Sequence, residues 1–176
     1  MKKFLAALLA VITVFTVFAL SACGGDKYAS LKIGSISGFG QNLINKSSFD
    51  YKLDIIDDDD FEYAATHQLK IDTALINYID GKPEMFRAMA TPAEEVLIIG
   101  AKDAEAAKQI ANGPITDWVK HLHDGYSDYG PEQLPKIDSC VKTVAGRYVF
   151  LIISKDNTAA KAALNELLDT ALKIHD

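Results

Sequence analysis

The sequence predicts an α+β fold: an antiparallel or mixed sheet of about four to five strands with about two to three helices, mainly on one face. Residues 96–99 and 148–153 are apolar at every position, which is typical of strands that are covered on both faces. Each of these segments runs into a stretch with helical spacing. The second of these stretches, residues 160–172, has one continuous apolar face.

Residues 1–22 have the pattern of a cleavable signal peptide of a bacterial lipoprotein. Two lysines precede an apolar stretch over residues 4–20, and small side chains lead to a cut between Ala22 and Cys23. This arrangement is a lipobox, in which the Cys23 thiol takes a diacylglyceryl thioether. The alternatives are a plain secretory leader or a transmembrane anchor. The apolar stretch is near the lower limit of about 17 to 25 residues for a membrane span, and its flanks are those of a signal peptide.

Lipidation predicts the location of the protein. Acyl chains such as palmitate contribute about 0.8 kcal/mol per buried methylene, so two or more chains give a stable membrane anchor. The sequence therefore predicts a lipoprotein held at the extracytoplasmic face of the cell membrane through Cys23. In bacteria with two membranes, an aspartate after the lipidated cysteine is a signal for retention in the inner membrane. This sequence has Gly24 at that position, so it does not contain that signal.

The mature chain is predicted to be a single domain on a tether. Residues 23–47 form the lipidated cysteine and a tether rich in Gly, Ser and Asn, with a short helical turn at residues 39–45. Residues 48–176 form the α+β domain. About 154 residues follow the leader, a usual size for one domain but small for a two-lobed solute-binding protein.

The charge of the chain argues against nucleic-acid binding. There are 18 basic and 24 acidic residues, and the net charge is −6. An acidic surface repels phosphate backbones and anionic lipid headgroups.

Four aspartates at residues 57–60 follow a strand-like segment, residues 49–55. A helix-loop-helix calcium loop needs glycine at its sixth position and glutamate at its twelfth, where this run has Glu62 and Gln68. We therefore expect the aspartates to cap a helix over residues 61–69.

Turn residues divide the remaining chain into paired strands. Asp80 and Gly81 predict a hairpin between residues 76–79 and 85–89, in which Pro83 delays the outgoing strand. A second hairpin is expected at Ala145-Gly146. Pro114 is expected to begin a helix whose apolar face contains Ile115, Trp118, Val119 and Leu122.

Residues 97–108 resemble residues 150–161 at a constant offset. Each segment is an apolar strand, then Lys-Asp, then a helix that opens with Ala-Ala-Lys, and Asp103 and Asp156 are expected N-caps. A further strand precedes each one, which suggests a ββα pseudo-repeat. The alternative is that any strand leading into a capped helix gives this pattern. With about three helices one sheet face is only partly covered, leaving the N-terminal segment or a partner to cover it.

The sequence gives only weak evidence for a catalytic or metal-binding site. His121 and His123 fall on nearly opposite sides of a helix, so a metal site would need His67 or His175 as well. Glycoside hydrolysis needs two carboxylates across a cleft, whereas the adjacent Glu94 and Glu95 point to opposite faces and read as strand-edge charges. We assign no catalytic residue, no metal ligand and no cofactor.

Cys140 and three aromatic residues have simpler structural interpretations. With Cys23 lipidated, Cys140 has no disulfide partner in the chain, and we expect a buried core thiol. Trp118, Tyr126 and Tyr129 could stack against a sugar, although Tyr129 before Gly-Pro more simply packs a loop.

The order of several segments resembles the DUF4358 family, lipoproteins of Gram-positive gut bacteria that are named only as a domain of unknown function. The resemblance covers roughly residues 50–171. The segments that carry it are Lys70-Ile71-Asp72, residues 91–99, residues 101–104, Tyr129-Gly130-Pro131-Glu132, residues 146–149 and residues 153–156. The resemblance implies a lipidated surface domain without assigned activity, so it transfers no functional residue beyond Cys23.

Two classes of function remain. The favoured one is a non-catalytic surface module that binds an envelope protein or another envelope component. The alternative is a binder of a small ligand or glycan, or an enzyme built from scattered residues. A large apolar surface patch without a deep pocket favours the first, and a concave pocket of Tyr and carboxylate side chains favours the second.

Overall fold

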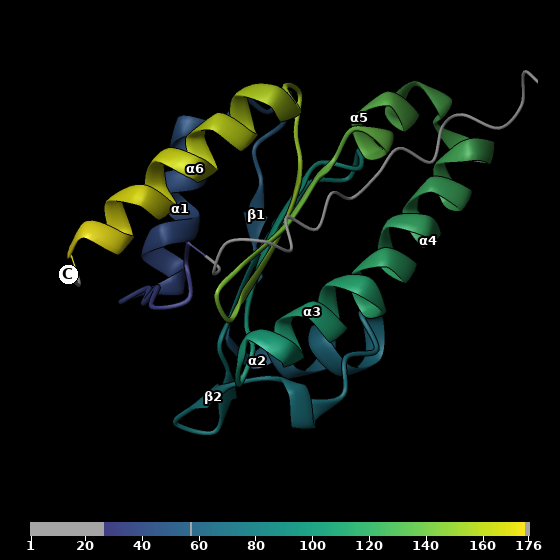
Figure 1. Ribbon diagram of the computed structural model, residues 1–176. Coiled ribbons are helices and arrows are strands. Elements are labelled where there is room, and N and C mark those ends of the chain that lie inside the picture. The colour runs from purple at the N-terminus through teal and green to yellow at the C-terminus, as the bar shows by residue number, and fades with distance from the viewer. Residues whose placement is uncertain (1–26, 57, 175–176) are drawn as a thin grey trace, which may run out of the picture.

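The computed structural model describes residues 27–56 and 58–174 (Figure 1). The predicted signal peptide, its cleavage site and Cys23 lie outside the described residues. So does most of the aspartate run, because Asp57 and the side chains of Asp58 and Asp59 are not described. Within the part of the chain that is described, no helix is both long enough and apolar enough to cross a membrane.

The main sheet has five antiparallel strands in the order β1-β4-β5-β7-β6, which confirms the predicted α+β class. At its centre β5 pairs with β7, and Leu97 lies opposite Leu151. The bounds of the strands are β1 Asp54–Ile55, β4 Met85–Met89, β5 Glu95–Gly100, β6 Val141–Ala145 and β7 Tyr148–Ile153.

A separate two-stranded hairpin joins β2 (Tyr78–Ile79) to β3 (Lys82–Pro83). Its turn confirms the prediction for Asp80 and Gly81, which have φ angles of 51° and 79°. Positive φ at both central residues is what a type I′ turn requires, and glycine adopts it without steric cost. The predicted outgoing strand is corrected: residues 85–89 pair with β5 in the main sheet, and residues 82–83 pair with β2.

Helices cover both faces of the sheet, whereas the sequence predicts helices mainly on one face. Figure 1 shows α1 and α6 on one side of the sheet and α3 and α4 on the other. The helices on the first face are α1 (Ile36–Lys46) and α6 (Asn157–Ile174). The second face has α2 (Asp58–Tyr63), the π-helix η1 (Ala64–Gln68), α3 (Ala104–Asn112), α4 (Pro114–Tyr129) and α5 (Leu134–Asp138). Two short 3-10 helices, η2 (Thr73–Leu75) and η3 (Pro131–Gln133), lie in the connections.

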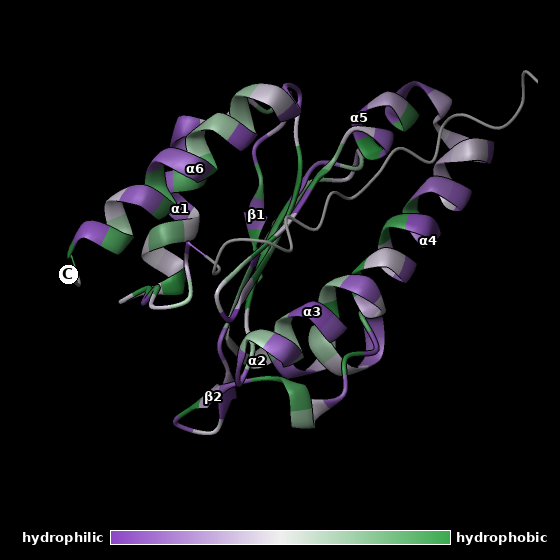
Figure 2. Ribbon diagram, viewed as in Figure 1, coloured by the Kyte–Doolittle hydropathy of each residue, from purple (hydrophilic) through white to green (hydrophobic). Residues whose placement is uncertain are grey.

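Two hydrophobic cores lie on opposite faces of the central strands. Side chains alternate along a strand, so each apolar strand supplies both cores. Leu97 and Leu151 pack under α3 and α4, whereas Ile98 and Phe150 pack under α1 and α6. Figure 2 shows these hydrophobic strands between two layers of helices that alternate hydrophilic and hydrophobic residues. The full burial of β5 and β7 confirms the interpretation of their uninterrupted apolar sequences.

Two ββα units are present, β4-β5-α3 and β6-β7-α6. The predicted N-caps are confirmed: the side chain of Asp103 accepts from the Ala106 amide at 2.8 Å, and that of Asp156 accepts from the Ala159 amide at 2.9 Å. The units are not symmetric, because the equivalent residues Leu97 and Phe150 belong to different cores. This difference in phase puts α3 and α6 on opposite faces of the sheet.

The N-terminal segment covers the face that the sequence leaves open. Leu43 of α1 is fully buried and Leu31 is 4% exposed. A Cβ at Gly40 would overlap the Phe86 ring, so this glycine allows α1 to approach the sheet closely. Ser35 caps α1 by accepting from the Gly38 amide at 3.0 Å. The packed unit therefore includes residues that the sequence assigns to the tether.

Candidate functional site

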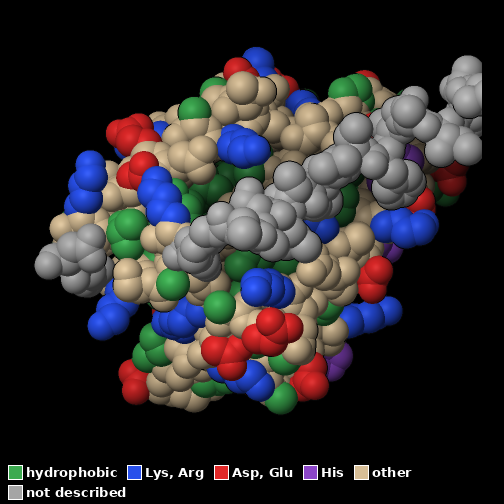
Figure 3. Space-filling view, viewed as in Figure 1, with side chains coloured by type: hydrophobic (Ala, Val, Ile, Leu, Met, Phe, Trp, Pro, Cys, Tyr) green, Lys and Arg blue, Asp and Glu red, His purple; other side chains and the backbone are tan. Residues whose placement is uncertain are grey.

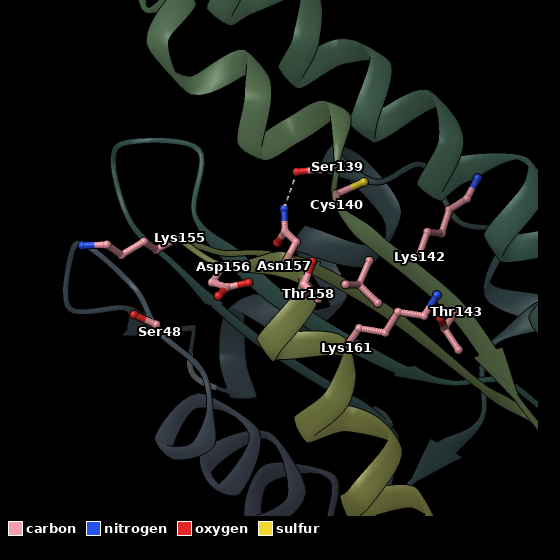
Figure 4. Close-up of a pocket in the computed structure, with 11 residues that line it drawn as sticks. Ser48, Ser139, Cys140, Lys142, Thr143, Lys155, Asp156, Asn157, Thr158 and Lys161 are labelled. Atoms are coloured by element: carbon pink, nitrogen blue, oxygen red, sulfur yellow. Dashed lines mark hydrogen bonds between the residues drawn. The ribbon is translucent and has the colours of Figure 1, made fainter. Parts of the chain in front are cut away.

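An open groove runs along the outer edge of β6, beside the first turn of α6 (Figure 4). Its volume is about 940 Å³. Lys142 and Thr143 both line it, although consecutive side chains of a strand point to opposite faces. The groove therefore lies at an edge of the sheet, because β6 is the last strand in the order that the described residues form. The lining residues are Ser48, Ser139, Cys140, Val141, Lys142, Thr143, Lys155, Asp156, Asn157, Thr158 and Lys161.

Asn157 fixes the upper end of the groove by joining the start of α6 to the segment that leads into β6. Its side-chain amide donates to the Ser139 hydroxyl at 3.0 Å, drawn as the dashed line in Figure 4, and to the Lys136 carbonyl at 2.8 Å. Its side-chain oxygen accepts from the Ser154 amide at 2.8 Å. These bonds hold the two walls together in the described chain.

The groove is basic although the chain is acidic. Lys142, Lys155 and Lys161 line it, against the single carboxylate Asp156, whose oxygen already caps α6. In Figure 4 Lys161 extends from α6 toward Thr143 on β6. Lysine is a common residue on edge strands, where its charge discourages pairing with another copy of the same strand. The same charges attract an acidic chain.

The lysines of the groove differ in their surroundings. The Lys142 ammonium donates to the Thr116 hydroxyl at 2.6 Å, and burial lowers the pKa of Lys142 below its ordinary value. The Lys155 ammonium lies 2.7 Å from an Asp50 oxygen, and this hydrogen bond raises the pKa of Lys155. Lys142 is thus positioned against α4, and Lys155 is partly neutralised.

Cys140 lines the groove as a free thiol that is partly buried. It packs against the core under α3 and α4, as the sequence predicts for a core thiol. Burial raises the pKa of Cys140 to about 11, and the nearby Lys142 opposes this only weakly. A thiol that stays protonated at neutral pH is a poor nucleophile, so the groove does not have the chemistry of a cysteine enzyme.

The native protein is expected to react slowly with a thiol reagent at Cys140. With a pKa of about 11, on the order of one thiol in a thousand is ionised at pH 8, against about one in ten for the ordinary value of 9.0. We expect labelling by Ellman's reagent to be about 100-fold slower in native protein than in denaturant. Equal rates would show that Cys140 is exposed.

A second pocket, of about 620 Å³, lies between η1 and α4. It is lined by His67, Gln68, Leu69, Lys70, Pro114, Asp117, Trp118 and His121. Lys70 has a φ of 54°, in the left-handed region, and a π-helical turn precedes it. Such turns and strained residues occur often at functional sites.

A buried ion pair underlies this second pocket. The Arg87 guanidinium, with no exposed surface, lies 2.7 Å from a Glu95 oxygen and donates to the Gln68 side chain at 2.5 Å. The Trp118 indole donates to the other Glu95 oxygen at 3.1 Å and lies over Arg87, with 4.9 Å from Cζ to the ring centre. The polar groups of this network bind each other.

The predicted carboxylate pair is divided between two networks. Glu94 accepts from the Asp50 amide at 2.9 Å and from the Lys136 ammonium at 2.9 Å, while Glu95 accepts from Arg87 and Trp118. Both glutamates are buried, which corrects the expectation of strand-edge charges. Their hydrogen-bond partners differ, although both glutamates line one pocket of about 330 Å³ together with Asp54 and Tyr126.

The histidines and tyrosines singled out in the sequence do not assemble into one site. His67 and His121 line the second pocket, whereas His123 lies 3.5 Å from Asp138, and His175 lies outside the described residues. Over the described residues, no three side chains of His, Cys, Asp or Glu come together as a metal site would need. Tyr126 donates to the Thr91 carbonyl at 2.6 Å, and Tyr129 is 93% exposed, so the proposed sugar-stacking trio is not formed.

The described surface gives little support to a large apolar patch. Figure 3 shows hydrophobic side chains scattered among charged ones on the face in view. The exposed large hydrophobic residues are Tyr51, Ile55, Tyr63, Ile79, Tyr129 and Ile174, which come from different elements. The groove and the second pocket are therefore the main candidates for binding.

Comparisons with known proteins place part of the chain in a family. No match was found among curated proteins or among solved structures. The model of a family described as "Domain of unknown function (DUF4358)" matches residues 71–154, from before η2 to the end of β7. This part contains β6 and the Arg87, Glu95 and Trp118 members of the buried network, whereas Gln68, α1 and α6 lie outside it. Residues 71–154 thus match the model of the DUF4358 family, the family that the order of segments in the sequence resembles.

Proposed function

We propose that this protein is a lipoprotein, anchored through Cys23 at the extracytoplasmic face of the cell membrane, whose domain binds an extended acidic segment of an envelope protein. The lipobox at Ala22-Cys23 supports the anchor. The basic groove along β6 supports the binding role, and the proposed function is non-catalytic.

The position of β6 at the edge of the sheet that the described residues form is the observation that carries the binding role. A strand at the edge of a sheet offers backbone donors and acceptors to an added strand, a common mode of peptide recognition. The other edge strand, β1, has only two residues, whereas β6 has five. In this mode backbone hydrogen bonds give affinity, and pockets for alternate side chains give specificity.

The charge of the groove selects the partner. Lys142 lies on the side of β6 that faces α4, and Lys161 extends from α6 on the other side. Carboxylates on both faces of an added strand can therefore meet an ammonium group. A second copy of β6 would instead bring lysines together, and like charges opposite each other destabilise strand pairing. The groove thus favours an acidic partner over self-association.

Neutralising both lysines is expected to weaken binding of an acidic peptide. The probe is a capped seven-residue peptide in which glutamate alternates with valine, titrated by calorimetry against the chain from Gly24 onward. Exposed ion pairs contribute about 0.2–1 kcal/mol each, so Lys142→Gln with Lys161→Gln is expected to raise the Kd by about 2- to 30-fold.

The matched control is Lys108→Gln. Lys108 is the equivalent of Lys161 in the first ββα unit, is exposed on α3 and does not line the groove. The control peptide has lysine in place of glutamate. The proposal is contradicted if Lys108→Gln weakens binding as much as Lys161→Gln does, or if the basic peptide binds equally well.

The second pocket supports a different function, the binding of a small polar or glycan ligand. The observations that favour it are the π-helical turn, the left-handed Lys70 and the partly exposed ring of Trp118. Trp118 is the sole tryptophan, so its fluorescence reports on this pocket. This alternative would be favoured by a sugar that changes this fluorescence and whose binding is unaffected by Lys142→Gln.

A further inference from the structure

We infer that the domain sits close to the bilayer in one orientation, with the C-terminal end of α6 toward the membrane and the β6 groove directed away from it. The inference rests on the proposed lipid at Cys23. It replaces the long tether expected from the sequence with a short one, and it specifies which surface of the domain meets lipid.

The fold holds the chain firmly from Lys27 onward. The Lys27 ammonium lies 2.6 Å from an Asp169 oxygen on α6, and the Tyr28 hydroxyl donates to the same carboxylate at 2.8 Å. A Cβ at Gly146 would overlap the Tyr28 carbonyl, so the segment is also packed against the β6–β7 turn.

The next residues of this segment continue the packing. The Ile33 amide donates to the Tyr148 hydroxyl at 3.0 Å, and Leu31 and Ile33 belong to the core under α1 and α6. Movement of Tyr28 away from the domain would break these contacts as well. The attachment point is therefore part of the folded unit.

The covalent chain between the lipid and this attachment point is short. Three residues lie between Cys23 and Lys27, so their Cα atoms are four steps apart along the chain. A chain spans at most about 3.6 Å per residue, so the two Cα atoms lie within about 15 Å of each other in any conformation. A tether of 25 residues, as the sequence predicts for residues 23–47, would reach several times further.

The end of the domain nearest the anchor contains an exposed apolar residue. Asp169, which binds Lys27 and Tyr28, lies one and a half turns of helix before Ile174. Ile174 is 72% exposed, and Lys173 beside it is also exposed. An isoleucine and a lysine at a helix end suit the boundary between acyl chains and headgroups. Figure 1 shows this end of α6 beside the N-terminal segment.

The groove lies at the opposite end of the same helix. Its residues on α6 are Asn157, Thr158 and Lys161, whereas the N-terminal segment binds Asp169. From Asn157 to Asp169 the helix rises about 18 Å at 1.5 Å per residue. In the inferred orientation the groove is therefore presented to the extracytoplasmic space, where a soluble or wall-facing segment can enter it.

Fluorescence quenching from the membrane tests this orientation. In the full lipidated chain, Cys140→Ala removes the native thiol, and a fluorophore is attached at Ile174→Cys or at Glu132→Cys. The protein is then reconstituted in vesicles of phosphatidylcholine and phosphatidylglycerol whose headgroups carry a nitroxide quencher. Glu132 is exposed in η3, which precedes the groove residue Ser139 along the chain, and it does not line the groove. We expect severalfold stronger quenching at position 174 than at position 132.

A longer linker provides the control for proximity. A flexible insert of 20 Gly and Ser residues between residues 26 and 27 has an r.m.s. span of about 25 Å. It is expected to keep the protein on the vesicles while removing most of the difference between the two labels. An unchanged difference would mean that the domain adheres to the bilayer by itself, which overturns the tether argument.

Flotation and intact mass separate the two possible failures. If Cys23 carries no diacylglyceryl group, or the protein does not float with the vesicles, the proposed anchor fails and this inference fails with it. If the protein is lipidated and floats but both labels are quenched equally, or position 132 more strongly, only the orientation is overturned.

Discussion

Replacing Arg87 by alanine is expected to lower the free energy of unfolding by about 3–5 kcal/mol, because it leaves the Glu95 carboxylate buried without its cationic partner. Arg87 makes two bonds to one Glu95 oxygen, at 2.7 and 3.0 Å, and a third to Gln68. Removing a charge from water is costly, and the guanidinium offsets this cost for the Glu95 carboxylate. Arg87 itself has no exposed surface.

Urea denaturation followed by circular dichroism measures this effect. Tryptophan fluorescence is less suitable, because Trp118 belongs to the network and its signal also reports the local change. The matched control is Lys120→Ala, which breaks an ion pair to Asp124 on the exposed surface of α4 and is expected to cost at most about 1 kcal/mol.

The pair can also be removed as a whole. Arg87→Met together with Glu95→Leu removes both charges and is expected to recover much of the loss, as seen when buried ion pairs are replaced by apolar residues. A cost for Arg87→Ala no larger than that for Lys120→Ala would contradict this account of the network.

Leu43→Ala in α1 is expected to destabilise the whole domain by about 2–5 kcal/mol. Leu43 is fully buried in the core that α1 and α6 form on the sheet, together with Phe86 and Phe150. Truncation leaves a cavity that the neighbouring side chains fill only in part. The effect would be absent if residues 23–47 were a tether, so this variant tests where the folded unit begins.

The control for this variant is Asn45→Ala, at an exposed position of the same helix. It is expected to change the stability by no more than about 0.5 kcal/mol. A single unfolding transition shifted by Leu43→Ala would show that α1 unfolds with the sheet. If Leu43→Ala leaves the transition unchanged, α1 is not part of the cooperative unit, and the short reach from Cys23 to the domain no longer follows.

Local patterns allowed much of the fold to be predicted. The uninterrupted apolar residues of β7, the N-caps Asp103 and Asp156 and the Asp80-Gly81 turn depend on neighbouring residues, and the structure confirms them. The layer to which each helix belongs depends instead on the phase of the preceding strand. A shift of one residue between β5 and β7 moves the following helix to the other face.

The N-terminal helix, α1, was predicted only in part, as a short helical turn at residues 39–45. Glycine and serine are typical of linkers, but Gly40 is required by the close approach of Phe86, and Ser35 is an N-cap. The role of Arg87 was not predicted either, because an arginine in a strand is usually interpreted as an exposed charge unless its partners are known. Glu95 pairs through strand contacts, while Gln68 and Trp118 are distant in sequence.

The groove could not be predicted from local sequence either. It forms where β6 meets the first turn of α6, and nothing in residues 139–143 shows that this strand is the last in the order of the described sheet. Lys142, Lys155 and Lys161 come together only through the sheet order and the packing of α6.

Backbone amide exchange in the presence of the acidic seven-residue peptide tests the central claim most directly. If the peptide adds a strand beside β6, it hydrogen-bonds to the backbone of Val141–Ala145, and the exchange of these amides with deuterium slows in an NMR experiment. The account predicts this protection in β6 and none in residues 67–70. Unchanged exchange in β6, with changes confined to residues 67–70 and 117–121, would contradict it and place the binding site in the second pocket.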